Sequence, residues 1–80
     1  MLDDEKLMDV LPMLRLEYMR AKSKHPHFPG DPARALAIVT EELLELARAV
    51  NDGETRKRVR EEAAHVAVTA IRLLEEVSEC

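Results

Sequence analysis

Residues 32–77 read PARALAIVTEELLELARAVNDGETRKRVREEAAHVAVTAIRLLEEV, which predicts two long helices joined by a tight turn. Asp31 before Pro32 is typical of an N-cap followed by the first helical position. A helix is therefore expected over residues 32–50, ended by Asn51-Asp52-Gly53, because glycine readily takes the left-handed conformation that closes a helix. Its expected apolar stripe recurs every three or four residues: Leu36, Val39, Leu43, Leu46, Ala47 and Val50.

Residues 54–77 predict a second long helix with an unusually broad apolar surface. Its main apolar face comprises Val59, Ala63, Val66, Ala70, Leu73 and Val77, and Ala64, Ala67, Val68 and Ile71 extend that face. The remaining polar sector comprises Glu61, Glu62, His65, Thr69, Arg72 and Glu76. A helix on the outside of a three-helix monomer needs a narrower stripe, so the surplus is expected to pack against a second subunit.

Residues 4–22 predict an N-terminal helix with a stripe of Leu7, Leu11, Leu14, Tyr18 and Ala21. Pro12 interrupts this pattern, which predicts a kink or a late start near Asp9. Residues 23–31, which hold two of the four prolines, predict an ordered loop. The expected fold is one all-α domain over residues 1–80, an antiparallel bundle of about three helices completed by homo-oligomerisation.

Charge and composition narrow the classes of partner. A formal net charge of −4 argues against binding of a nucleic-acid polymer, which needs a basic face. No apolar run approaches the roughly 20 residues of a membrane span, and acidic residues stand where a signal peptide would be basic. The single cysteine, Cys80, has no internal disulfide partner, so a reducing, cytoplasmic setting is expected.

Two pairs of polar side chains lie beside the expected apolar stripes. Glu42 and Glu45 are three residues apart, and Glu62 and His65 repeat that spacing on the next helix. Because a tight turn makes these helices antiparallel neighbours, both pairs are expected to face one cleft. Carboxylates on facing helices can bind hard cations such as Mg²⁺, which bridge them to a substrate's phosphates. The alternative is an ordinary solvated face, because glutamate is a good helix former.

The stretch Glu41-Glu42-Leu43-Leu44-Glu45, followed after sixteen residues by Glu62-Ala63-Ala64-His65, resembles the MazG-like all-α nucleoside triphosphate pyrophosphohydrolases. Their pattern is E-x-x-E, a spacer, then E-x-x-D, and the similarity covers residues 32–74. The resemblance implies a homodimer or homotetramer of helical bundles with Mg²⁺, or alternatively Mn²⁺, bound by the acidic cluster. It also implies hydrolysis of an NTP or dNTP to a monophosphate and pyrophosphate.

Carried over residue by residue, the resemblance implies that Glu42, Glu45 and Glu62 ligate the metal. Glu41, or another acidic group near the metal, would orient the attacking water. Arg72 lies in the sector of His65 and is a candidate for binding a phosphate. The alternative for this arginine is an ion pair with a neighbouring glutamate on its own helix.

His65 departs from the family pattern, which has Asp at this position. Imidazole is a poor ligand for Mg²⁺ and a better one for Mn²⁺ or Zn²⁺. His65 is therefore expected to ligate a softer metal, to hydrogen-bond a phosphate or water, or to mark a site that has lost catalysis. The structural alternative is a histidine paired with Glu61 or Glu62 at the rim of the core.

Three functions follow from these residues. The first is a MazG-like nucleotide pyrophosphohydrolase. The second is a non-catalytic relative that binds nucleotides or a protein partner through the same helices. The third is a structural oligomerisation module, in which alanine at all three proposed ligand glutamates would leave function intact.

Overall fold

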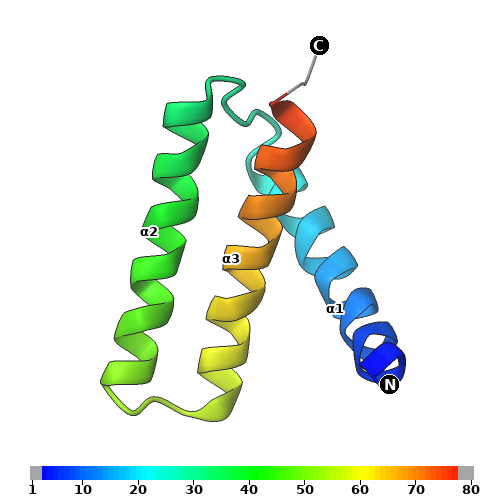
Figure 1. Cartoon of the computed structure of the whole chain (residues 1–80), viewed down its shortest axis with the longest axis vertical. Helices are drawn as coiled ribbons and strands as arrows, with labels where there is room; N and C mark the ends of the chain where they lie inside the picture. Colours follow the sequence, from blue (N-terminus) through cyan, green and yellow to red (C-terminus); the bar gives the residue numbers. More distant parts are fainter. Residues whose placement is uncertain (1–2, 78–80) are drawn as a thin grey trace.

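The computed structural model describes residues 3–77, which form three helices and the two segments that connect them (Figure 1). The helices are α1 (Asp3–Lys24), α2 (Pro32–Asn51) and α3 (Arg56–Glu76). No strand occurs within residues 3–77, so the predicted all-helical class with three helices is confirmed. Cys80, for which no disulfide was predicted, lies outside the described residues.

α2 begins and ends at signals in its own sequence. The Asp31 carboxylate accepts a hydrogen bond from the Arg34 backbone N–H at 3.0 Å, and Pro32 occupies the first turn, where its missing N–H leaves no bond unmade. At the other end the Asp52 N–H donates to the Arg48 carbonyl at 2.8 Å, and Gly53 has a φ of 68°. The predicted N-cap and the glycine stop are therefore confirmed.

α3 begins at Arg56 rather than at Glu54 as predicted, because Thr55 is its N-cap. The Thr55 hydroxyl oxygen accepts a hydrogen bond from the Arg58 backbone N–H at 3.1 Å. This bond satisfies one of the N–H groups that a helix leaves without a partner in its first turn. The helix then runs to Glu76, where the Val77 N–H donates to the Leu73 carbonyl.

α1 continues through Pro12, so the late start near Asp9 that was one of the two predictions for this segment is wrong. A proline inside a helix removes one backbone N–H from the hydrogen-bond ladder. Met8 and Leu11, which precede the proline, are exposed, so water can reach the carbonyl that lacks its partner. This access to solvent makes the interruption tolerable.

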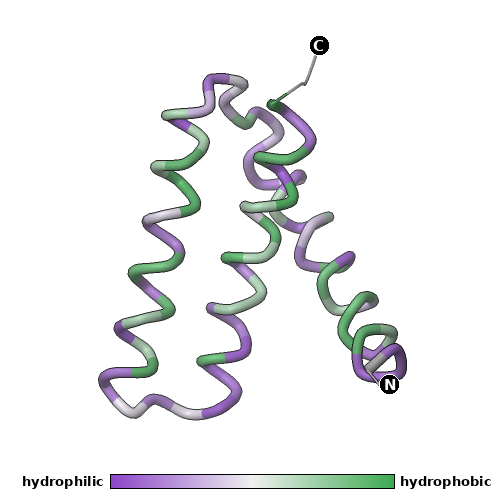
Figure 2. The backbone as a smooth tube through the Cα atoms, in the orientation of Figure 1, coloured by the Kyte–Doolittle hydropathy of each residue, from purple (hydrophilic) through white to green (hydrophobic). Residues whose placement is uncertain are grey.

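α2 and α3 form an antiparallel hairpin, and α1 packs against α3 on the other side (Figure 1). α1 and α2 do not contact each other within the described residues, so α3 is the central helix. Figure 1 shows α1 diverging from α3 toward its N-terminus. In Figure 2 the later part of α3 is mainly apolar, whereas its beginning and the α2–α3 turn are hydrophilic. The buried apolar core comprises Ala35, Ala49, Ala64 and Val68.

The face of α2 turned toward the core differs from the predicted stripe. Leu36 and Leu43, both in that stripe, are 58% and 51% exposed, whereas Ala35 and Ala49 are buried. Helical periodicity identifies which residues share a face, but it leaves open which face a neighbouring helix covers. Here the two alanines face α3 together with the half-buried Leu46 of the predicted stripe, whereas Leu36 and Leu43 face outward.

α3 also turns part of its predicted polar sector inward. Glu62 and Arg72 are only 2% and 4% exposed, beside the buried Ala64 and Val68. α1 and α2 cover the broad apolar surface of α3 only in part, because Ala63 and Ala70 of its predicted apolar face are exposed. The exposed large apolar side chains lie mainly on the outer helices: Leu7, Met8, Leu11, Leu16 and Met19 on α1, Leu36, Leu43, Leu44 and Val50 on α2, and Leu74 on α3. None of the described helices combines the length and apolarity needed to cross a bilayer.

Candidate metal centre

The α2–α3 hairpin brings Glu42, Glu62 and His65 together. Each offers one ligand atom, and these atoms lie within 4.8 Å of one another. Glu42 comes from the middle of α2, and the other two come from successive turns of α3. The antiparallel arrangement places these turns opposite each other, as expected for two helices joined by a short connection.

Glu62 is the most deeply buried member of this cluster. Its Oε2 atom forms an ion pair with the Arg58 guanidinium, which lies 2.6 Å away and one turn earlier in α3. Its Oε1 atom is buried and has no hydrogen-bond partner within residues 3–77. A buried carboxylate oxygen without a donor is costly in a folded protein, so this atom suits a cation.

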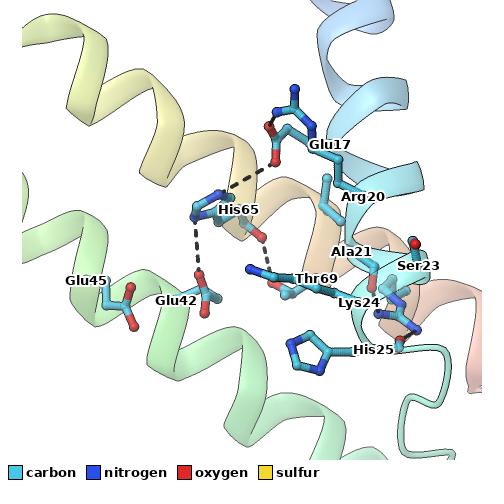
Figure 3. A pocket seen from close by; sticks show the side chains of 12 residues that line it. Glu17, Arg20, Ala21, Ser23, Lys24, His25, Glu42, Glu45, His65 and Thr69 are labelled. Carbon is cyan, nitrogen blue, oxygen red and sulfur yellow. Dashed lines mark hydrogen bonds and ion pairs between the residues drawn. The ribbon is translucent and has the colours of Figure 1, made fainter.

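His65 lies among three carboxylates, and Figure 3 shows its ring between those of Glu17 and Glu42. Its Nδ1 atom lies 3.5 Å from Glu62 Oε1 and 3.7 Å from Glu42 Oε1. Its Nε2 atom lies 3.7 Å from Oε2 of Glu17, which comes from α1. The distance to Glu62 fits the predicted alternative, in which His65 pairs with a glutamate at the rim of the core. The same positions also fit a set of metal ligands.

The surroundings of Glu42 shift the pKa of its carboxyl. Partial burial raises the pKa of its carboxyl above the ordinary value, and the neighbouring Glu45 raises it further. His65 opposes the shift, while Glu62 and Glu41 add to it. A site that raises the pKa of a carboxylate in this way gains when a cation is present, because the cation stabilises the charged form.

The other two predicted glutamates are placed differently. Glu45 lines the same pocket as Glu42 and His65, and Figure 3 shows both glutamates along one side of it. Glu45 lies outside the group whose ligand atoms are within 4.8 Å. Glu41 is exposed and does not line this pocket. Of the acidic candidates, Glu45 is thus better placed than Glu41 to act on a molecule in the pocket.

The pocket holds about 640 Å³ and lies among all three helices. Glu42 and Glu45 contribute negative charge from α2, and Arg20 and Lys24 contribute positive charge from α1. The Arg20 guanidinium is paired with the carboxylate of Glu17 at 2.8 Å. Carboxylates facing cationic side chains suit a ligand that carries both a bound cation and free anionic oxygens.

Arg72 lines the pocket, but its donors point to α1. Its Nη2 donates to the His25 carbonyl at 2.7 Å and its Nη1 to the Ala21 carbonyl at 3.4 Å. Its guanidinium carbon lies 5.0 Å from the centre of the Phe28 ring. The arginine therefore uses two of its five N–H donors to bind carbonyls at the end of α1.

Two residues of the site were missed by sequence reasoning, Glu17 and Arg58. Like the other glutamates of the site, Glu17 lies beside the apolar stripe of its helix, between Leu14 and Tyr18. That signal was present but was not applied to α1. Arg58 lies four residues before Glu62, a spacing typical of a helical ion pair. Its importance depends on the burial of Glu62, which local sequence does not reveal.

Two carboxylates and one imidazole, with one buried oxygen unpartnered, form a donor set that fits a divalent metal ion. No protein-family model, curated protein or solved structure matches this chain. Functional assignment therefore depends on the site itself.

Proposed function

We propose that this chain is a metal-dependent pyrophosphohydrolase that converts an NTP or dNTP to its monophosphate and pyrophosphate. The observation that carries the proposal is the convergence of Glu42, Glu62 and His65, whose ligand atoms lie within 4.8 Å beside a pocket lined by both acidic and basic side chains. The resemblance of residues 32–74 to the MazG-like family suggests the reaction, and the pocket supports a phosphorylated ligand.

Glu42, Glu62 and His65 would hold the metal, with Mn²⁺ suiting the imidazole better than Mg²⁺. When bound, such an ion neutralises phosphate charge and lowers the pKa of a coordinated water. Glu45 lines the pocket next to this group and is placed to orient a water and accept its proton. That water adds across the anhydride bond between the α- and β-phosphates, and the products leave as a monophosphate and pyrophosphate.

The basic side of the pocket would bind the phosphate chain. Arg20 and Lys24 both line it from α1, and Lys24 lies in the last turn of that helix. Charge-assisted hydrogen bonds from these side chains to phosphate oxygens are stronger than those between neutral groups.

A non-catalytic module that binds a nucleotide or protein partner is the second candidate. It is favoured by internal neutralisation of Glu62, whose carboxylate forms an ion pair with Arg58 at 2.6 Å. Such neutralisation reduces the negative potential that attracts a metal. This candidate predicts that a nucleotide raises the melting temperature without being hydrolysed.

Pyrophosphate release from a panel of canonical and modified NTPs and dNTPs, each with Mg²⁺ or Mn²⁺, tests the first function. At least one substrate should be hydrolysed, and Glu42→Gln should lower the rate by about 10²–10³-fold, because the metal that Glu42 would help to hold stabilises the developing negative charge. Glu5→Gln, an exposed carboxylate on α1, is the matched control and should have no effect. No release from any nucleotide would reject catalysis.

His65→Asp separates the two candidates, because it restores the family's carboxylate. A large gain in hydrolysis would show that the natural chain is a weakened or retired enzyme. A loss of existing activity would show that the imidazole has its own role. Circular dichroism of the variant establishes that both readings refer to a folded protein.

A further inference from the structure

We infer that Glu17 is a positioning residue for the metal centre: its carboxylate orients the His65 ring so that Nδ1 faces the cluster. The inference concerns a residue of α1, outside the two helices that carry the E-x-x-E and E-x-x-H pairs. It rests on the metal site of the proposed function. It does not depend on whether that site hydrolyses a nucleotide.

The two ring nitrogens of His65 face different partners. Nε2 lies 3.7 Å from Glu17 Oε2, while Nδ1 lies on the side of Glu62 and Glu42. In a neutral imidazole one nitrogen carries the proton and the other has a free electron pair. A cation bound by Nδ1 would leave the proton of the neutral ring on Nε2, the nitrogen that faces the Glu17 carboxylate.

Glu17 is itself held in position. Its Oε1 atom is paired with the Arg20 guanidinium at 2.8 Å, and its other oxygen, Oε2, faces His65. The two oxygens of this carboxylate therefore face separate partners. Arg20 and Glu17 are three residues apart on α1, and the relay from arginine to carboxylate to imidazole crosses from α1 to α3 (Figure 3).

A second observation indicates that a cation would bind on the Nδ1 side of the His65 ring. Glu62 Oε1, which is buried and unpartnered within the described residues, lies 3.5 Å from His65 Nδ1. No comparable oxygen of this kind is found near Nε2, where the Glu17 carboxylate is only partly buried. The arrangement thus has the form carboxylate–histidine–metal, in which the outer carboxylate sets the ring and raises the basicity of the ligand nitrogen.

The test is titration of the full chain with Co²⁺, a probe ion whose visible absorption reports on its ligands. Glu17→Met should weaken Co²⁺ binding by about 10–100-fold, the range found for outer-shell partners of metal-binding histidines, and should change the absorption spectrum. Glu17→Gln retains a carbonyl acceptor and should restore part of the affinity. Glu5→Gln on the same helix is the control and should bind as the natural chain does.

The same substitution in a His65→Asp background distinguishes positioning from simple loss of negative charge. Without the imidazole, Glu17→Met should change Co²⁺ affinity by less than about threefold. An equal loss in both backgrounds, or no loss with His65 present, would overturn the inference. Should Glu17→Met fail to fold, the comparison is made with Glu17→Gln in both backgrounds.

The outcomes for binding and for turnover are separable. Co²⁺ binding that depends on Glu17, combined with no nucleotide hydrolysis, supports the inference and rejects the proposed activity. Co²⁺ binding and hydrolysis that are both indifferent to Glu17 reject the inference alone. A chain that binds no Co²⁺ at millimolar concentration rejects both.

Discussion

At the scale of single residues, folding brings the carboxylates of Glu42 and Glu62 close together, whereas they are far apart in the unfolded chain. Glu42 is the residue whose carboxyl pKa is raised, first by burial and then by Glu45. Glu62 is more deeply buried but has Arg58 at 2.6 Å, so its charge is matched. The negative charge of Glu62 is therefore balanced by Arg58, whereas no arginine or lysine within the described residues pairs with Glu42.

This asymmetry predicts how stability depends on pH in the absence of metal. Because the pKa of Glu42 is raised above its ordinary 4.5, the folded chain holds more protons than the unfolded chain between the two values. The free energy of unfolding therefore falls as pH rises through that window, and the loss persists at higher pH. Glu42→Gln should make the chain more stable than the natural one near neutral pH, with an advantage that shrinks in acid.

Thermal unfolding followed by circular dichroism across this pH range, with a chelator present, measures the effect. Glu5→Gln, which removes an exposed carboxylate from the same chain, should show no such pH-dependent gain. Parallel pH profiles for the natural chain and Glu42→Gln would contradict the prediction. The substitution should thus raise stability while lowering the proposed activity, an exchange common at functional sites.

At the scale of elements, α1 is held to the hairpin by contacts near its C-terminal end. Arg72 of α3 donates to two carbonyls at that end, and Tyr18 donates to Glu75 Oε2 at 2.6 Å. The opposite half of the helix carries the exposed Leu7 and Met8. The attachment that positions Glu17 beside His65 therefore depends on a few polar contacts more than on a continuous apolar interface.

Arg72→Met should accordingly loosen α1 and leave α2 and α3 folded. Loss of charged hydrogen bonds from a buried side chain should lower the free energy of unfolding by about 2–3 kcal/mol. Amide hydrogen exchange should accelerate in α1 well before it does in the α2–α3 hairpin. Arg72→Lys keeps the charge and should recover part of the loss. Uniform acceleration across all three helices would contradict this account.

At the scale of the whole molecule, the single chain leaves much surface uncovered. It exposes 6345 Å², whereas a compact monomer of 9.1 kDa exposes about 4,900 Å². Its radius of gyration is 13.6 Å, compared with about 12 Å for a compact domain of 80 residues. The excess surface exceeds the roughly 800 Å² that each partner buries in a standard interface, which favours the proposed homo-oligomer.

The outward apolar stripe of α2, which includes Leu36 and Leu43, is the surface we expect a second copy to cover. Sedimentation should show a dimer or tetramer, and Leu43→Glu should shift the chain toward monomer while helicity is retained, because a buried unpaired charge opposes association. Arg48→Glu, at an exposed position of the same helix, is the control and should preserve the oligomer. A natural chain that sediments as a monomer would contradict the proposal.

The sequence by itself determined the helices and the spacing of the site residues. The Asp31 cap, the Gly53 stop and the three-residue spacing of Glu62 and His65 act over a single turn, where local hydrogen bonds and backbone conformation decide the outcome. A periodic pattern therefore suffices to predict that two helices exist and which side chains share a face.

Only the tertiary structure decided which faces meet. The inward alanines of α2, the burial of Glu62 against Arg58 and the approach of Glu17 to His65 depend on the relative rotation of three helices. That rotation is set by the sum of many weak contacts between segments distant in sequence, and no local pattern encodes it. The α2–α3 part of the candidate metal centre was thus predictable from the sequence, and the contribution of α1 was not.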